Sequence, residues 1–148
     1  VAAGSTDSSG AQTTGVTTVN AGSGAPSGGA LGPDGPLGSQ RVIYFDFDRS
    51  DIRPEYATLI NSHAKFLAGS SAVKIRVEGH TDERGSREYN IALGQKRADS
   101  VKRMLMLMGA QEAQIETVSF GKEKPKHPGH DEAAWAQNRR DDIVYAGA

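Results

Sequence analysis

The chain has 148 residues, a net charge of −1 and 36% hydrophobic residues, which fits one domain with room for a tail. A nearly neutral chain has no global field that would draw it to nucleic acid or to an anionic membrane. Cysteine is absent, which excludes disulfides, zinc–thiolate sites and cysteine nucleophiles. The longest apolar run, 104–108, is far too short to cross a bilayer.

Residues 1–40 differ in composition from the rest of the chain. They hold 10 of the 18 glycines, no aromatic residue, and only Asp7 and Asp34 as charged residues. Such a segment buries too little apolar surface to offset the entropy lost on ordering. We therefore expect a flexible tether over 1–40, with a mean reach of roughly 35 Å, and a folded domain over 41–148. The run 35–39 also resembles a protease-site remnant, so a leader added for expression is the alternative for part of the tether.

The first half of the domain alternates strand and helix patterns. The β-branched and aromatic run 42–47 predicts a mostly buried strand, and the turn residues 48–51 follow it. Pro54 suits the first position of a helix whose apolar residues recur at helical spacing up to Gly69. Apolar Val73, Ile75 and Val77 alternate with charged residues, which predicts a half-buried strand.

The second half continues the alternation. After the loop 79–86 a long helix is expected to end at Gly109, and a third strand to cover 115–120. A short helix over 131–137 and a last strand over 142–146 complete the chain. The fold class is therefore an α/β (α+β) sandwich, β-α-β-α-β-(α)-β, with a small mixed sheet and two main helices on one face.

The segment 79–98 is the most informative part of the sequence. It places the carboxylate of Asp82 in a glycine-containing turn and the guanidinium of Arg97 on the helix that follows. A carboxylate can hold an ammonium group, and a planar guanidinium can grip a carboxylate with two parallel hydrogen bonds. The pair therefore suits a zwitterion such as an amino-acid headgroup. A purely structural ion pair between Asp82 and Arg97 is the alternative.

The amino-acid sequences of several segments resemble those of the OmpA-like peptidoglycan-binding domain. The opening strand and turn at 44–52 and the loop and helix at 79–103 carry this resemblance. The runs 119–125 and 129–140 are closer still to one branch of the family, a lipoprotein of Gram-negative outer membranes. The resemblance covers about 41–146 and its motifs together are highly specific.

The resemblance implies a ligand and a set of residues that contact it. The ligand is the meso-diaminopimelate of peptidoglycan stem peptides, whose ammonium is held by Asp82 and whose carboxylate is gripped by Arg97. Asp48, with its neighbours Phe47 and Ser50, contributes contacts from the turn after the first strand. Three further residues line or brace the pocket in the family, namely Thr81, Asn90 and Leu93. Asn90, Leu93 and Arg97 fall on one helical face, which fits a shared pocket.

The resemblance also implies a role in the cell envelope. We expect non-covalent tethering of the outer membrane to the cell wall, within the Tol system of envelope integrity and cell division. TolB is the chief expected partner and TolA a further candidate, with TolB docking on a surface that overlaps the pocket. The lipid anchor that would hold such a protein to the outer membrane, facing the periplasm, is absent from these 148 residues because they contain no cysteine. No cofactor, no metal, no enzymatic activity and no nucleic-acid partner are implied.

Fewer features of the sequence support other classes of function. A metal hydrolase would draw on six potential ligands, but they lack the tight spacing of known zinc motifs: His80, His127, His130, Asp82, Asp131 and Glu132. A glycosidase needs two placed carboxylates, which Asp46, Asp48 and Asp82 could supply. The basic run 138–140 would suit a phosphate or nucleic-acid patch, or it would hydrogen-bond loops and pin the last strand.

Overall fold

The computed structural model describes residues 40–146. The expected tether therefore lies, apart from its last residue, outside the described residues. The elements in chain order are β2 (Val42–Tyr44), η2 (Pro54–Tyr56), α3 (Ala57–Ala68), β3 (Ile75–His80), α4 (Arg87–Leu107), η3 (Glu112–Gln114), β4 (Ile115–Gly121), α5 (Glu132–Asn138) and β5 (Arg140–Tyr145).

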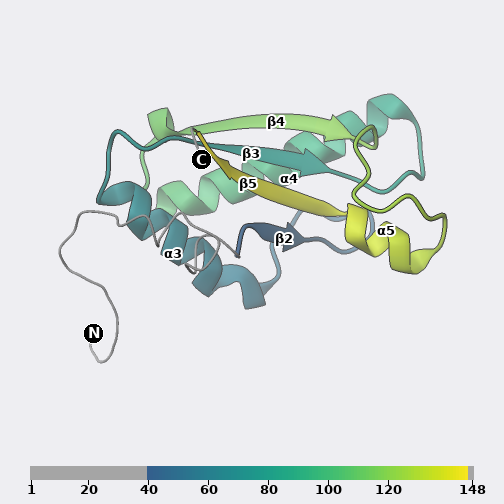
Figure 1. The fold of residues 1–148 in the computed structure, drawn as a ribbon, viewed down its shortest axis with the longest axis horizontal. Coiled ribbons are helices and arrows are strands. Elements are labelled where there is room, and N and C mark those ends of the chain that lie inside the picture. The colour runs from purple at the N-terminus through teal and green to yellow at the C-terminus, as the bar shows by residue number, and fades with distance from the viewer. Residues whose placement is uncertain (1–39, 147–148) are drawn as a thin grey trace.

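The four strands form one mixed sheet in the order β2-β5-β3-β4. β3 and β4 are parallel, whereas β5 lies between β2 and β3 and is antiparallel to both. The last strand of the chain thus occupies a central position, and its neighbours come from the first and the middle parts of the domain. The long helix α4 runs along one side of the sheet, and α5 lies at the carboxyl ends of β3 and β4 (Figure 1). The predicted fold class and its small mixed sheet are confirmed.

Apolar side chains between the sheet and helices α3 and α4 form the core. Ile75 and Val77 of β3 point to this side together with Ile143 and Tyr145 of β5, as the two-residue period of strands requires. The buried His63 of α3 joins this core through both ring nitrogens, which contact the Tyr145 hydroxyl at 2.6 Å and the Gln40 carbonyl at 2.7 Å. The opposite face of the sheet carries the alternate residues of each strand.

The first strand is shorter than the sequence predicts. The expected strand 42–47 ends at Tyr44, although the Phe45 N–H still donates to the Arg139 carbonyl at 2.9 Å. The chain then turns, with Asp48 at a positive φ of 57°, and the side chain of Phe47 is 56% exposed. The hydrophobic pattern of 42–47 predicts a continuous strand, but its last aromatic residue, Phe47, belongs to the turn. The other strands and helices agree with the predicted segments within a few residues at each end.

A glycine–glycine contact sets the distance between α4 and β3. A Cβ atom on Gly79 would lie 1.9 Å from the carbonyl oxygen of Gly94, and a Cβ on Gly94 would lie 2.3 Å from the Ser119 hydroxyl. Real Cβ atoms do not approach backbone so closely, so β3 and α4 can pack at this spacing only because both positions lack a side chain. The contact lies directly beside the end of β3, where the sequence predicts the functional loop.

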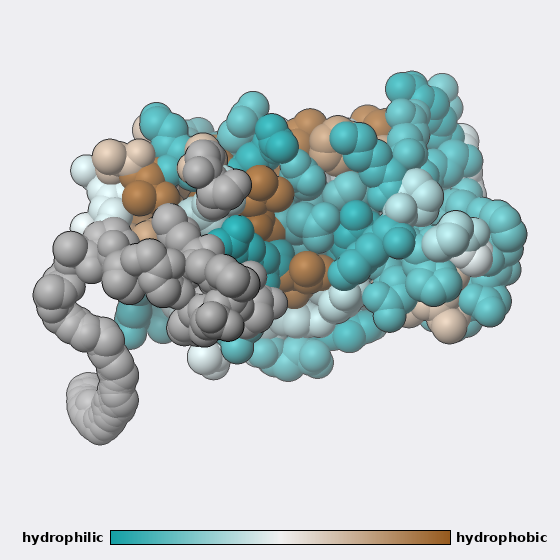
Figure 2. All heavy atoms as spheres, viewed as in Figure 1, coloured by the Kyte–Doolittle hydropathy of each residue, from teal (hydrophilic) through white to brown (hydrophobic). Residues whose placement is uncertain are grey.

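Among the described residues, no helix combines the length and the apolar character needed to span a membrane. Hydrophilic side chains dominate the uncovered right-hand part of the face drawn in Figure 2, around α5.

The glycine contact leads to a stability prediction. Gly79→Ala should lower the free energy of unfolding by at least about 2 kcal/mol, because the added methyl group meets the α4 backbone and the helix must shift. Urea unfolding followed by circular dichroism measures the change. Gly69→Ala is the matched control, because its Cβ would lie 3.5 Å from the nearest atom, at ordinary contact distance. Equal effects of the two substitutions would contradict the close-packing explanation.

Candidate functional site

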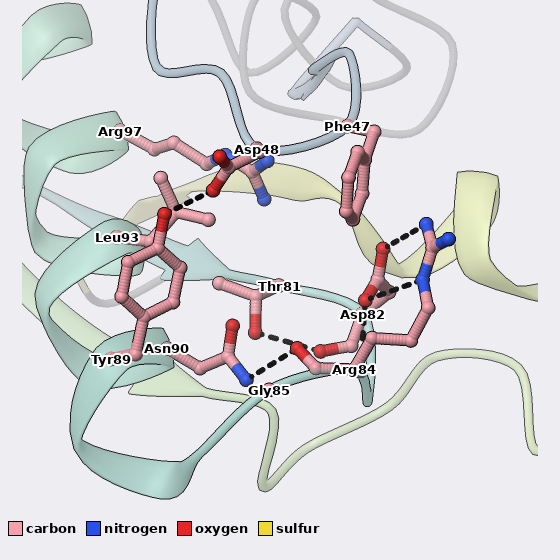
Figure 3. A pocket seen from close by; sticks show the side chains of 10 residues that line it. All are labelled: Phe47, Asp48, Thr81, Asp82, Arg84, Gly85, Tyr89, Asn90, Leu93 and Arg97. Carbon is pink, nitrogen blue, oxygen red and sulfur yellow. Dashed lines mark hydrogen bonds and ion pairs between the residues drawn. The ribbon is translucent and has the colours of Figure 1, made fainter.

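A pocket of about 260 Å³ lies at the carboxyl end of β3, between the loop that follows it, the start of α4 and the turn after β2. Figure 3 shows the side chains that surround it. The lining residues are Phe47, Asp48, Thr81, Asp82, Arg84, Gly85, Tyr89, Asn90, Leu93 and Arg97. The volume suits a small headgroup rather than a larger organic molecule.

Arg97 reaches the pocket from α4 and is 0% exposed. Its guanidinium donates Nε–H to the Arg49 carbonyl at 2.7 Å, Nη1–H to the His80 carbonyl at 2.8 Å and Nη2–H to the Asp46 carbonyl at 3.1 Å. Burial lowers the pKa of Arg97 to about 10. Because this value is still well above 7, the group stays charged at neutral pH. A guanidinium has five N–H donors, so these three bonds leave one N–H on each terminal nitrogen.

Asp82 lies at the other end of the pocket and is 4% exposed. Its Oδ1 accepts the backbone N–H of Arg84 at 2.9 Å, and its Oδ2 accepts Nη2–H of the same residue at 2.9 Å. Nη1 of Arg139 lies 3.5 Å from Oδ2. Burial opposes ionisation of Asp82, but the hydrogen bonds from Arg84 outweigh it and hold the pKa of the carboxyl below its ordinary value. The ion pairs of Asp82 are therefore with Arg84 and Arg139 and not with Arg97.

Arg84 is held between two aromatic rings. Its guanidinium carbon lies 4.1 Å from the ring centre of Phe47 and 4.1 Å from that of Trp135, a geometry suited to cation–π attraction. The indole N–H of Trp135 in turn donates to Glu83 at 2.7 Å. This stack joins the turn after β2, the loop after β3 and α5 at one wall of the pocket.

The opposite wall is polar and aromatic. The Tyr89 hydroxyl donates a short hydrogen bond to Asp48, and Figure 3 shows the Asp48 carboxylate in front of the Arg97 side chain. Asn90 donates its side-chain amide to the Arg84 carbonyl at 2.9 Å, which fixes the loop above the start of α4. The Thr81 hydroxyl donates to the Asp82 carbonyl at 2.9 Å. Cationic and anionic groups are thus distributed around one cavity.

Seven of the eight residues named from the sequence line this pocket, and Ser50 does not. Ser50 lines a separate cavity formed with the C-terminal half of α4. Three lining residues were missed: Arg84, Gly85 and Tyr89. Tyr89 carried a usable signal, because it stands four residues before Leu93 and eight before Arg97 and so shares their helical face. Arg84 carried none beyond its place in the loop.

The structure also bears on two alternatives drawn from the sequence, the role of the run 138–140 and the metal-hydrolase site. Asn138 accepts the backbone N–H groups of Lys126 and His127 at 2.7 and 2.9 Å, and Arg139 donates to the Phe45 carbonyl at 3.0 Å. The run 138–140 is buried and holds loops, as its structural reading predicted. Within the described part of the chain, the six potential ligands named for a metal hydrolase do not form a metal-binding group.

The structure is an α/β sandwich with a small pocket at the end of a central strand, and both acidic and basic side chains line this pocket. Comparison with known proteins places this architecture. The model of the OmpA family matches residues 44–139. A peptidoglycan-associated lipoprotein of Pseudomonas aeruginosa is 50% identical over 137 residues, which are 90% of this chain and 81% of the relative.

Solved structures agree with these matches. A crystal structure of the peptidoglycan-associated lipoprotein from Burkholderia pseudomallei matches with a TM-score of 0.76 and 52% identity, over 78% of this chain and 98% of that one. The C-terminal domain of Helicobacter pylori MotB, at 22% identity and a TM-score of 0.65 over 72% of this chain and 83% of its own, shares the fold. The chain belongs to the OmpA family and, within it, to the peptidoglycan-associated lipoproteins.

A second buried carboxyl lies behind the pocket, on the core face of β5. Asp141 is 0% exposed, its Cα pairs with that of Gly79, and neither carboxyl oxygen has a hydrogen-bond partner among the described residues. Burial raises the pKa of Asp141 well above its ordinary value, and the positive charge of Arg97 opposes this only in part. The folded state therefore holds a proton on this group at pH values where the unfolded chain has released it.

Asp141 should consequently make the fold less stable as pH rises. Above the unfolded pKa of about 3.9, the native state binds more protons, so the free energy of unfolding falls until the pH passes the raised folded pKa. Asp141→Asn cannot titrate. Relative to the parent protein, its unfolding free energy should therefore increase between pH 4 and pH 8, by about 1.4 kcal/mol for each pH unit that lies between the unfolded and the raised folded pKa. Urea unfolding at several pH values measures this difference, and a difference independent of pH would contradict it.

Proposed function

We propose that this pocket binds the diaminopimelate of peptidoglycan stem peptides without catalysing a reaction. One observation carries the proposal: a buried carboxylate, Asp82, and a buried guanidinium, Arg97, face one small cavity from two different elements. The free end of diaminopimelate carries an ammonium and a carboxylate on one carbon, and the two protein groups are complementary to them. The membership of the chain in a family of peptidoglycan-associated lipoproteins supports this choice among zwitterions.

At the carboxylate end, Arg97 offers the two N–H groups that its backbone hydrogen bonds leave free. They lie on the two terminal nitrogens, which suits the two oxygens of a carboxylate. Because Arg97 is fully buried, a neighbouring side chain must move before the ligand carboxylate reaches it. We expect Asp48 to be that side chain, because it lines the same pocket and its charge acts on Arg97. The Asp48–Tyr89 hydrogen bond is therefore expected to rearrange on binding.

At the ammonium end, the ligand meets a carboxylate that already has a cation. Arg84 occupies Asp82 with its backbone N–H and its guanidinium, as an internal substitute for the ligand ammonium. Binding then exchanges one charged partner for another, and the buried carboxylate stays paired throughout. Such an exchange avoids the large cost of leaving a buried charge without a partner.

The wider role follows from this binding. We propose that the domain holds uncrosslinked stem peptides while the segment 1–40 links it to a lipid anchor in the outer membrane, with the domain facing the periplasm. The protein would thereby tether the outer membrane to the cell wall and act with the Tol system in envelope integrity and cell division. No cofactor takes part in this mechanism.

Calorimetric or NMR titration with a diaminopimelate-containing stem peptide tests the pocket directly. We expect saturable binding of this peptide. The affinity should fall at least about tenfold, roughly 1.4 kcal/mol, when the carboxylate at the free end of diaminopimelate is amidated or when a lysine-containing peptide is used. Asp82→Asn should cause a loss of similar size, because it removes the charge and keeps the acceptor for the Arg84 N–H. The carboxylate end is tested by changing the ligand and not Arg97, because Arg97→Ala would lose three hydrogen bonds to backbone carbonyls and would endanger folding.

Two further variants sharpen this titration. Glu112→Gln removes an exposed carboxylate outside the pocket and should leave binding unchanged. Arg84→Gln removes the internal cation and should tighten binding at least about threefold, whereas weaker binding would show that Arg84 contacts the ligand. Failure of a folded parent protein to bind any stem peptide would contradict the proposed function.

We further propose TolB as a protein partner whose docking surface overlaps the pocket. The exposed aromatic side chains Phe47 and Tyr89 stand at the pocket and supply the kind of residue that protein interfaces favour. Stem peptide and TolB should then compete. Titration of TolB into the chain saturated with peptide should give a reduced apparent affinity, and simultaneous binding at full affinity would exclude a shared surface.

A further inference from the structure

The face of the sheet opposite the helices carries a cluster of three metal-ligating side chains that the pocket does not use. Glu78 and His80 are two residues apart on β3 and therefore point to the same side. Asp142 of β5 is the Cα partner of Glu78 across the sheet, so the three side chains share one face. One potential ligand atom from each lies within 4.8 Å of the other two.

The ring nitrogens of His80 give a separate reason to expect a bound ligand. The side chain is 2% exposed, and neither ring nitrogen has a hydrogen-bond partner in the described part of the chain. Buried polar atoms are normally paired, so each unpaired one requires an explanation. The ring stacks on Phe120, with 5.5 Å between the ring centres and 28° between the planes, which fixes its orientation toward the two carboxylates.

The distances agree with coordination of one small cation. Nε2 of His80 lies 3.4 Å from Oδ2 of Asp142 and 4.0 Å from Oε1 of Glu78. Tetrahedral zinc with bonds of 2.0–2.2 Å places its ligand atoms about 3.4 Å apart. Of the three ligand pairs, His80–Asp142 already has this spacing and His80–Glu78 needs a shift of roughly half an ångström. The Glu78–Asp142 pair lies within 4.8 Å and must also close up.

Arginines hold both carboxylates in place. Arg76 donates to Oε2 of Glu78 at 2.8 Å and leaves Oε1 toward His80. Arg140 donates to both oxygens of Asp142 at 3.2 Å. Such outer partners orient metal ligands, although their positive charges also reduce the affinity for a cation.

We propose that Glu78, His80 and Asp142 form a binding site for Zn²⁺ with at least one position open to solvent. One imidazole and two carboxylates suit a borderline cation of this kind better than Mg²⁺, which prefers oxygen ligands alone. The site does not depend on the proposed peptide binding. It lies on the other face of the sheet, although His80 also accepts the hydrogen bond from Arg97 through its carbonyl.

Titration of the metal-free protein with Zn²⁺, followed by calorimetry and by thermal unfolding, tests the site. We expect one equivalent of Zn²⁺ to bind and to raise the unfolding temperature, because the cation binds the native arrangement. Mg²⁺ at the same concentration should not. Asp142→Asn and Glu78→Gln should each weaken Zn²⁺ binding at least about tenfold.

Controls separate this cluster from the remaining histidines and from general charge. Glu116→Gln removes an exposed acid from β4, outside the cluster, and should leave Zn²⁺ binding unchanged. His127→Gln and His130→Gln should also leave it unchanged, since both side chains lie outside the cluster. Loss of binding in either of these histidine variants, or undiminished binding by Asp142→Asn, would overturn the proposal. So would the absence of Zn²⁺ binding by the folded parent protein.

Discussion

The guanidinium of Arg97 joins the three segments that build the pocket. It extends from α4 and donates to carbonyls in the turn after β2 and at the end of β3. A buried guanidinium needs hydrogen-bond partners that offset the loss of water, so the three carbonyls that accept from Arg97 must stay where they are for the charge to remain inside. The requirement fixes Asp48 and the loop from Thr81 onward relative to the helix. The position of the binding groups is thus a consequence of how one buried cation is paired.

Close packing makes this arrangement possible. Arg97 stands three residues after Gly94 on α4, and Gly94 contacts Gly79, the residue before His80. With side chains at these glycines the helix would stand farther from the strand, and the Arg97 side chain, whose length is fixed, would not reach all three carbonyl groups. Backbone contact and charge pairing therefore support each other: the glycines set the spacing, and the arginine uses it.

The two carboxylates of the pocket, Asp82 and Asp48, have hydrogen-bond or ion-pair partners before any ligand arrives. Asp82 is held by Arg84 and Arg139, and Asp48 by Tyr89. In the proposed binding mode a ligand takes over these partners, so a ligand that carries both an ammonium and a carboxylate would be favoured over one with a single charge. The proposed selectivity for zwitterionic over singly charged headgroups would then require neither a deep nor a rigid cavity.

Local patterns in the sequence determined most of the elements, because the periods of helices and half-buried strands depend only on neighbouring residues. They located α3, α4, β3 and the loop that carries Asp82, and the resemblance of the motifs indicated the family. The tertiary structure decided what depends on distant partners. The first strand ends early, Ser50 lines a different cavity, and Arg84 takes Asp82 as its partner. Asp142 joins Glu78 and His80 only because the last strand enters the sheet beside β3. Strand order follows from packing of the whole chain, so no local pattern contains it.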